Sequence, residues 1–200
     1  MKDLVLLVAD KNAEYALKGA FEQTARLGIH PITFEIRVHP GRDGGVRKTG
    51  SEVLARERRR FSHALLVMDF EGCGADSDAL TLEAELDGKL RATWNYDSKA
   101  IVIEPEVDVW MWGSDNAIRD VIDWPLDGSI REWLREKGFG FQADGKPLRP
   151  KEAMEAVVEE ANQPRSSALY CKIASSISLR KCTDAAFQRL RQQLVDWFPE

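Results

Sequence analysis

Polar side chains follow four short apolar segments of the chain, and their types are those that bind a hard cation. In chain order they are Asp10 and Glu14, the loop from His39 to Gly45, Asp69 and Glu71, and the group Glu104, Glu106 and Asp108. Mg²⁺ takes oxygen ligands, usually one or two carboxylates together with water and phosphate. These carboxylates therefore predict a Mg²⁺ or Mn²⁺ site, if the fold brings the four segments together.

Asp69 and Glu71 are the strongest candidates for metal ligands. They end the most apolar segment and lie two residues apart, so their side chains share a direction if the strand continues through them. Gly72 then lets the backbone approach a ligand closely. The alternative is structural: an Asp at a strand end forms a turn or caps a helix, and Glu14 is a first-turn acid favoured by the helix dipole. The fourth group is then a solvated edge around Pro105.

A basic stretch follows the second apolar segment and includes the glycine-containing loop. Residues 37–60 carry eight basic side chains, against four acidic ones in or beside the stretch. This local excess favours contact with a phosphate backbone, although an exposed helix face has the same composition. The residues that we expect to bind phosphate or nucleic acid are His39, Arg42, Arg47 and Lys48.

The elements that must position these residues alternate between strands and helices. Strands are predicted at 4–9, 32–38, 63–68 and 99–103, with helices at 13–27, at 51–60 and around the stripe formed by Leu82, Leu86 and Leu90. Strands that alternate with helices form βαβ units, whose right-handed crossovers produce a parallel sheet. We therefore expect an α/β fold with a four-stranded parallel sheet sandwiched by helices. Ligands bind at the carboxyl ends of such strands, where the polar groups lie.

The second half of the chain is predicted to be helical. Helices are expected at 115–122 and 130–137, from Pro150 onward, and after a cap at Thr183. The stretch 142–150 is the predicted boundary between an α/β domain at 1–141 and a C-terminal helical region at 142–200. We expect the two parts to pack as one structural unit.

Composition excludes several classes of protein. The 200 residues carry a net charge of −5, so the whole chain does not attract nucleic acid, and the three cysteines form no CxxC pair. The first apolar run is too short for a signal peptide, and no stretch approaches the roughly 18 apolar residues of a membrane span. A cytoplasmic protein without a membrane partner is expected. Nothing resembles a Walker loop, a nucleophile elbow, a dinucleotide fingerprint or a zinc-protease helix.

The order of the acidic residues resembles the Toprim-like domains of overcoming-lysogenization-defect nucleases and of a related family of short bacterial proteins. Those domains have a Glu-Gly-x-x-Glu pattern after the first strand, where this chain has Asp10 to Glu14, and an Asp-x-Asp pair after the third, where it has Asp69-Phe70-Glu71. Further similar segments of the short family are Asp43-Gly44-Gly45, Asp108-Val109-Trp110 and the segment from Arg180 to Phe187.

Four residues depart from the patterns of that family. Asp10 stands in place of a glutamate, Lys11 of a glycine, Glu71 of the second aspartate, and Asp108 of a glutamate. The acidic exchanges keep the charge but move each carboxylate by about one methylene group, and small misplacements weaken catalysis more than binding. Lys11 also adds a positive charge beside the site.

The resemblance implies a divalent-metal-binding protein from a methylation-associated phage-defence system. The metal, Mg²⁺ or Mn²⁺, would be held by Asp10, Glu14, Asp69 and Glu71, and Glu14, Asp69 and Glu71 would serve catalysis in a nuclease or phosphoryl-transfer enzyme acting on nucleic acid. The alternative is a non-catalytic subunit with a degenerate site, which contacts a protein partner in a defence complex. It would make this contact through its aromatic second half. The tryptophans of that half, Trp110, Trp112, Trp124 and Trp133, are expected first to pack in the core between the sheet and the helical tail, and only second to form a partner surface.

Overall fold

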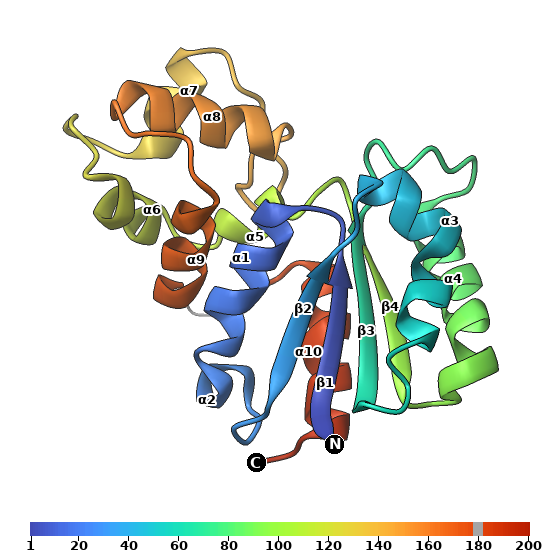
Figure 1. The fold of residues 1–200 in the computed structure, drawn as a ribbon. Helices are drawn as coiled ribbons and strands as arrows, with labels where there is room; N and C mark the ends of the chain where they lie inside the picture. Colours follow the sequence, from blue (N-terminus) through green and yellow to red (C-terminus); the bar gives the residue numbers. More distant parts are fainter. Residues whose placement is uncertain (178–181) are drawn as a thin grey trace.

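The structure, a computed structural model, describes residues 1–177 and 182–200 and confirms the predicted α/β fold. Its strands are β1 (Lys2–Val8), β2 (Phe34–Val38), β3 (Phe61–Asp69) and β4 (Ser98–Ile103). They form a parallel sheet in the order β2-β1-β3-β4 (Figure 1). The helices are α1 (Lys11–Phe21), α2 (Thr24–Leu27), α3 (Arg42–Ala55), α4 (Ala79–Trp94), α5 (Asp108–Met111), α6 (Asp115–Ile122), α7 (Ile130–Glu136), α8 (Pro150–Glu160), α9 (Ser167–Ser176) and α10 (Ala185–Trp197).

The strand order places a topological switch point between β1 and β3. From β1 the chain crosses to β2 through α1 on one face of the sheet, and from β2 it crosses back to β3 through α3 on the other face. The connections therefore diverge on either side of the β1–β3 pair. In sheets of this kind a crevice opens at the carboxyl ends of the two strands, and ligands bind there.

The sheet has a hydrophobic layer on each face because β1 and β3 are buried on both sides. One layer contains Leu4, Leu6 and Val8 together with α1 and α10, and the other contains Val5 and Leu7 together with α3 and α4. Figure 1 shows α3 and α4 beyond one face of the sheet and α1 and α10 beyond the other. Because both strands are packed on both faces, they are held in place, and the residues that follow them have fixed positions.

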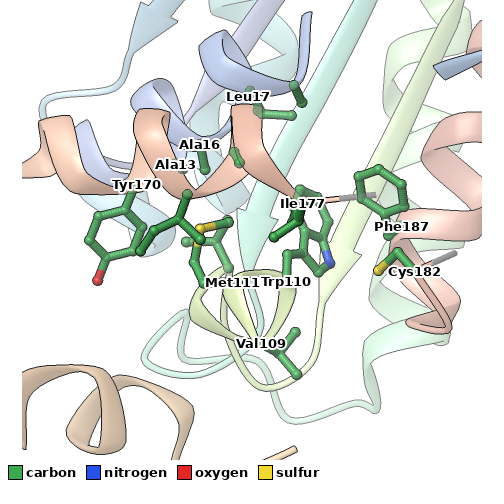
Figure 2. Close-up of a cluster of buried hydrophobic side chains, with 14 of the residues drawn as sticks. Ala13, Ala16, Leu17, Val109, Trp110, Met111, Tyr170, Ile177, Cys182 and Phe187 are labelled. Carbon is green, nitrogen blue, oxygen red and sulfur yellow. The ribbon is translucent and has the colours of Figure 1, made fainter. Parts of the chain in front are cut away.

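The second half of the chain packs on α1. Helices α1 and α9 cross so closely that a Cβ atom on Gly19 would lie 2.3 Å from the carbonyl oxygen of Cys171. Figure 2 shows Ala13, Ala16 and Leu17 of α1 in the same cluster of buried hydrophobic side chains as Trp110 and Met111 of α5. The hydrophobic layer is thus continuous from the α/β part into the C-terminal helices. The boundary between 141 and 142 stays a prediction.

The edge strand β4 is covered by charged side chains. The backbone N–H groups of Ala100 and Val102 donate to Asp87 Oδ1 at 2.6 Å and to Glu83 Oε2 at 3.0 Å. Arg189 of α10 holds Glu83 through two hydrogen bonds of 2.8 Å. Acids four residues apart on α4 thus bond to N–H groups two residues apart on β4. The two acids thus occupy backbone N–H groups of β4 with which a further strand would have to pair.

Two sequence-based assignments need correction, and part of a third lies outside the described residues. The helix expected at 51–60 begins at Arg42 and ends at Ala55, so the loop expected up to Gly45 ends at Gly41, about one turn earlier. The cap of the last helix is Asp184 rather than Thr183, because the Asp184 carboxylate accepts a hydrogen bond from the N–H of Phe187. Arg180 and Lys181 of the segment similar to the short bacterial family lie outside the described residues.

Within residues 1–177 and 182–200, no helix is both long enough and apolar enough to cross a membrane.

Candidate acidic metal site

A cleft of about 600 Å³ opens at the carboxyl edge of the sheet, beside the switch point. Seven acidic residues line it, together with two basic residues and three glycines. The full lining is Asp10, Gly41, Arg42, Asp43, Gly44, Asp69, Glu71, Gly72, Glu106, Lys151, Glu152 and Glu155. The sequence-distant carboxylates therefore converge at one edge, as the alternating pattern of strands and helices predicts.

Asp69 is the most firmly held acid of the cleft. Its Oδ1 accepts a hydrogen bond of 2.8 Å from the N–H of Val107, and its own N–H donates to Asp43 Oδ1, also at 2.8 Å. Loss of solvation raises the pKa of Asp69 well above its usual value, and the negative charges of Asp43 and Asp10 raise it further. Carboxylates crowded in this way favour either a proton or a cation between them.

Asp43 joins the site from the first turn of α3. Burial raises its pKa, and the charge of Asp10 adds to the effect. The turn before it is fixed by His39, whose Nδ1 accepts a hydrogen bond of 3.0 Å from the N–H of Gly41. A Cβ on Gly45 would lie 2.5 Å from that same Nδ1. The glycine is therefore needed for close packing inside a helix, rather than for a flexible loop.

Asp10 and Glu71 line the cleft together with Asp69. Asp10 is the N-cap of α1, because its Oδ1 accepts a hydrogen bond of 2.9 Å from the N–H of Ala13. The N–H of Glu71 donates to the carbonyl oxygen of Pro105 at 3.0 Å, and its exposed side chain lines the cleft. Asp10 thus has the structural role that the sequence left open, and it still borders the cleft.

The segment after β4 supplies two more acids with raised pKa values. Burial raises the pKa of Glu106 to about 7, and the negative charge of Asp108 contributes. Lys151, whose Nζ lies 3.7 Å from Glu106 Oε2, lowers this pKa in part. Burial also raises the pKa of Asp108 to about 6, although Asp108 accepts a hydrogen bond of 2.5 Å from the Tyr170 hydroxyl. In Figure 2 that hydroxyl points away from Ala13. Glu106 is therefore able to exchange a proton near neutral pH.

Not all of the predicted residues line the cleft. Asp10, Asp69, Glu71 and Arg42 do. Glu14 instead pairs with Lys11, whose Nζ lies 2.5 Å from Glu14 Oε2. His39 shares a hydrogen bond of 3.0 Å with Thr49 Oγ1, and Arg47 Nε donates to the carbonyl oxygen of Cys73 at 3.0 Å. Lys48 is exposed on α3.

Arg56, Arg58, Arg59 and Arg60 lie between α3 and β3, toward the opposite edge of the sheet. Arg58 and Arg60 precede β3, and nine strand residues, about 26 Å of extended chain, separate them from the cleft. Arg58 pairs with Asp97 at 3.0 Å, and Arg60 pairs with Glu57 at 2.8 Å. The basic end of the helix expected at 51–60 is thus a turn, which is remote from the acids of the cleft and paired with acids of its own.

Several residues of the cleft were not assigned to the site from the sequence. Asp43 was noted only within its Asp-Gly-Gly motif, and Glu106 only among the acids after the fourth strand. The order of the sheet brings Glu106 to the site, because β4 is the neighbour of β3, and the hydrogen bond from the Asp69 N–H joins Asp43 to it. Lys151, Glu152 and Glu155 come from α8, more than eighty residues beyond Asp69, and no spacing or motif connects them with it.

The donor chemistry of the cleft suits a hard cation. Among the residues that the structure describes, no three His, Cys, Asp or Glu side chains are close enough to hold a metal ion as they stand. Mg²⁺ is commonly bound through one or two protein carboxylates, and water and phosphate complete its shell. The raised pKa of Asp69 shows that its ionised form lacks a nearby positive charge, which a cation would supply. Asp69, with Glu71 or Asp10, therefore fits as a partial ligand set.

Comparisons with known proteins add no assignment to this geometry. No model of a known protein family matches the chain, and no curated protein or solved structure matches it significantly.

Proposed function

We propose that this protein is a Toprim-like, divalent-metal-binding component of a cytoplasmic bacterial defence system that acts on nucleic acid as a nuclease or phosphoryl-transfer enzyme. The observation that carries the proposal is the crowding of Asp69, Asp43 and Asp10 in an open cleft at the switch point, with the pKa of Asp69 raised by its surroundings. Like charges held together at a ligand-binding edge destabilise the fold. A bound cation offsets this cost.

The proposed chemistry divides between the metal and the side chains of the chain. Mg²⁺ or Mn²⁺ would polarise a phosphate and lower the pKa of bound water. Asp69 and Glu71 would hold the ion, with Asp10 beside them. Arg42 and Lys151 are the two basic residues of the lining, and they would orient the phosphate.

Proton transfer is assigned to Glu106 rather than to Glu14, which was expected to serve catalysis. Glu14 does not line the cleft, whereas Glu106 is 7% exposed within it and has a pKa of about 7. A general acid or base is most effective when its pKa is near the working pH. Lys151 adjusts this pKa from a distance of 3.7 Å. The proposal thus keeps Asp69 and Glu71 as catalytic residues and adds Glu106.

Cleavage of plasmid DNA and single-stranded DNA with Mg²⁺ or Mn²⁺ tests this proposal. Asp69→Asn keeps the oxygen that accepts from Val107 but removes the charge, and cleavage should fall by about a hundredfold or more. Glu52→Gln removes an exposed acid of α3 outside the cleft and should leave cleavage unchanged. Equal cleavage by the wild type and Asp69→Asn would contradict the proposal, as would inactivity of the wild type with both metals.

The second candidate is a non-catalytic subunit that contacts a protein partner. It is favoured by the charge of the cleft, where seven acids face two basic residues, and by the pairing of Arg58 and Arg60 away from it. In this case Mn²⁺ would still raise the melting temperature of the protein, but neither metal would support cleavage. Metal titration and the cleavage assay together separate the two candidates.

A further inference from the structure

A second cavity lies next to the acidic cleft, between the start of α1, α8 and α9. Its volume is about 190 Å³. Apolar side chains of α8 and α9 form much of its lining, including Met154, Val158, Leu169 and Ile173. Polar groups complete it, among them Asn12 of α1 and Ser167 of α9. The cavity therefore combines an apolar interior with a few oriented hydrogen-bonding groups, as small-molecule sites do.

The two cavities share a wall. Glu155 lines both of them. At the start of α1, Asp10 lines the acidic cleft and Asn12, two residues later, lines the second cavity. A ligand with one group in the cleft and another in the cavity would thus span only neighbouring residues of α1 and α8.

The size of the second cavity suits one six-membered ring. An apolar cavity of about 150 Å³ in another protein binds benzene, so 190 Å³ holds a ring of that size with a few polar substituents. A single six-membered ring matches this volume more closely than a fused two-ring base does. The volume therefore favours a pyrimidine over a purine.

The polar groups of the cavity favour a neutral ligand with donors and acceptors on its edge. Ser167 Oγ donates to Asn12 Oδ1 at 2.8 Å, which fixes the plane of the Asn12 amide. The amide keeps two N–H donors and a further acceptor site on its oxygen. Glu155 and Arg165, the charged residues of the lining, pair with each other at 3.2 Å. Their charges cancel, so the cavity does not select an ion.

We propose that this cavity binds one pyrimidine base of the nucleic-acid substrate, while the adjoining phosphate lies in the acidic cleft. The inference rests on the proposed function and names the substrate group that the site would select. Base recognition in proteins combines contact with the ring and hydrogen bonds to its edge. The apolar side chains of α8 and α9 supply the contact with the ring, and Asn12 supplies the hydrogen bonds to its edge.

Nucleoside binding without metal or phosphate tests the cavity alone. Thymidine and deoxycytidine, titrated into the full chain and followed by NMR, should give saturable shifts, with deoxyguanosine at least fivefold weaker. Asn12→Ala should weaken pyrimidine binding roughly five- to tenfold, the value of one hydrogen bond. No saturable binding of either pyrimidine, or equal binding of deoxyguanosine, would overturn the inference.

Filling the cavity gives an independent check. Val158→Phe should abolish nucleoside binding and leave the Mn²⁺-dependent rise in melting temperature intact, and Leu126→Phe, at a 38% exposed site outside the cavity, should change neither. Should Val158→Phe fail to fold, the half-buried Leu169→Trp replaces it. Nucleoside binding that survives in the folded filled variant would contradict the inference.

Thymidine 5′-phosphate tests the link between the two cavities. Mn²⁺ should tighten binding of this nucleotide at least fivefold and leave thymidine unaffected. Absence of that coupling in a protein that binds Mn²⁺ would refute the shared substrate. Cleavage by a protein that binds no nucleoside would refute this inference while the proposed function stands. Nucleoside binding without Mn²⁺ binding would refute the proposed function but would support the pyrimidine cavity.

Discussion

The backbone N–H of Asp69 donates a hydrogen bond of 2.8 Å to the Asp43 carboxylate. This bond joins the end of β3 to the first turn of α3, and it fixes one acid beside another. The charge of Asp43 is the second largest cause, after desolvation, of the raised pKa of Asp69. A fold that holds two carboxylates in this relation is less stable than it would be without their charges, which is typical of functional sites.

Neutralising Asp69 should stabilise the protein without metal. Asp69→Asn keeps the acceptor for Val107 and removes the repulsion from Asp43 and Asp10, so the free energy of unfolding should rise by about 1 kcal/mol or more. Urea unfolding at pH 7.5 with a chelator measures the change. Millimolar Mn²⁺ should then stabilise the wild type and not the variant. A less stable Asp69→Asn would show that the acid is mainly structural.

Stability should fall as pH rises from about 4.5 to 7. Glu106 and Asp108 have pKa values of about 7 and about 6 in the folded protein, above their usual values of 4.5 and 3.8. The folded state therefore binds more protons in this range, and its extra stability is lost as these groups ionise. His63, whose pKa burial lowers from 6.5, acts in the opposite direction below that pH.

The pH profile separates these groups. Glu106→Gln should flatten the fall in the free energy of unfolding between pH 5 and 7, and Mn²⁺ should flatten it in the wild type by favouring the ionised acids. Chemical unfolding at half-unit pH intervals provides the measurement. A profile that rises from pH 5 to 7 would show that His63 outweighs the carboxylates.

Two adjacent glycines of α3 should respond differently to alanine. Gly45→Ala places a Cβ 2.5 Å from His39 Nδ1, so the turn before Asp43 must move, and the variant should lose about 1–3 kcal/mol of stability. The nearest neighbour of a Cβ on Gly44 is Cys73 O at 3.8 Å. Gly44→Ala should therefore be neutral or stabilise by up to about 1 kcal/mol, because alanine favours helix. Similar effects of both changes would contradict the packing argument.

The same glycines explain where prediction from the sequence failed. The four strands could be found because their apolar runs are buried on both faces, and Asp69 was placed because it ends the most apolar run. Asp43-Gly44-Gly45 reads as a loop because glycine disfavours helix. Tertiary contacts decide otherwise: Asp43 accepts from Asp69, and Gly45 makes room for His39.

The candidate site was predictable only where it depends on strand ends. Asp10, Asp69 and Glu71 follow β1 and β3, so the topology of a parallel sheet brings them together. Glu14 depends on the rotation of α1, which sequence spacing does not determine, and its pairing with Lys11 keeps it out of the cleft. Lys151 and Glu155 arrive on α8 through packing of the second half, which leaves no local signal in the sequence.

Removing Glu83 should both destabilise the protein and uncover the β4 edge. Glu83→Ala leaves the Val102 N–H and the Arg189 guanidinium without the carboxylate that now binds both, and breaking a buried ion pair in this way costs about 3 kcal/mol or more. Glu85→Ala, at an exposed position of the same helix, should cost less than about 0.5 kcal/mol. Urea unfolding compares the two variants.

The freed Val102 N–H should also make the edge strand available for pairing with a second copy of the chain. Size-exclusion chromatography of Glu83→Ala should therefore show concentration-dependent association that Glu85→Ala lacks. The double variant Glu83→Ala/Val102→Pro removes the N–H donor, and it should abolish association even if it is less stable. Association that persists in the double variant would show that the contact arises from partial unfolding and not from the β4 edge.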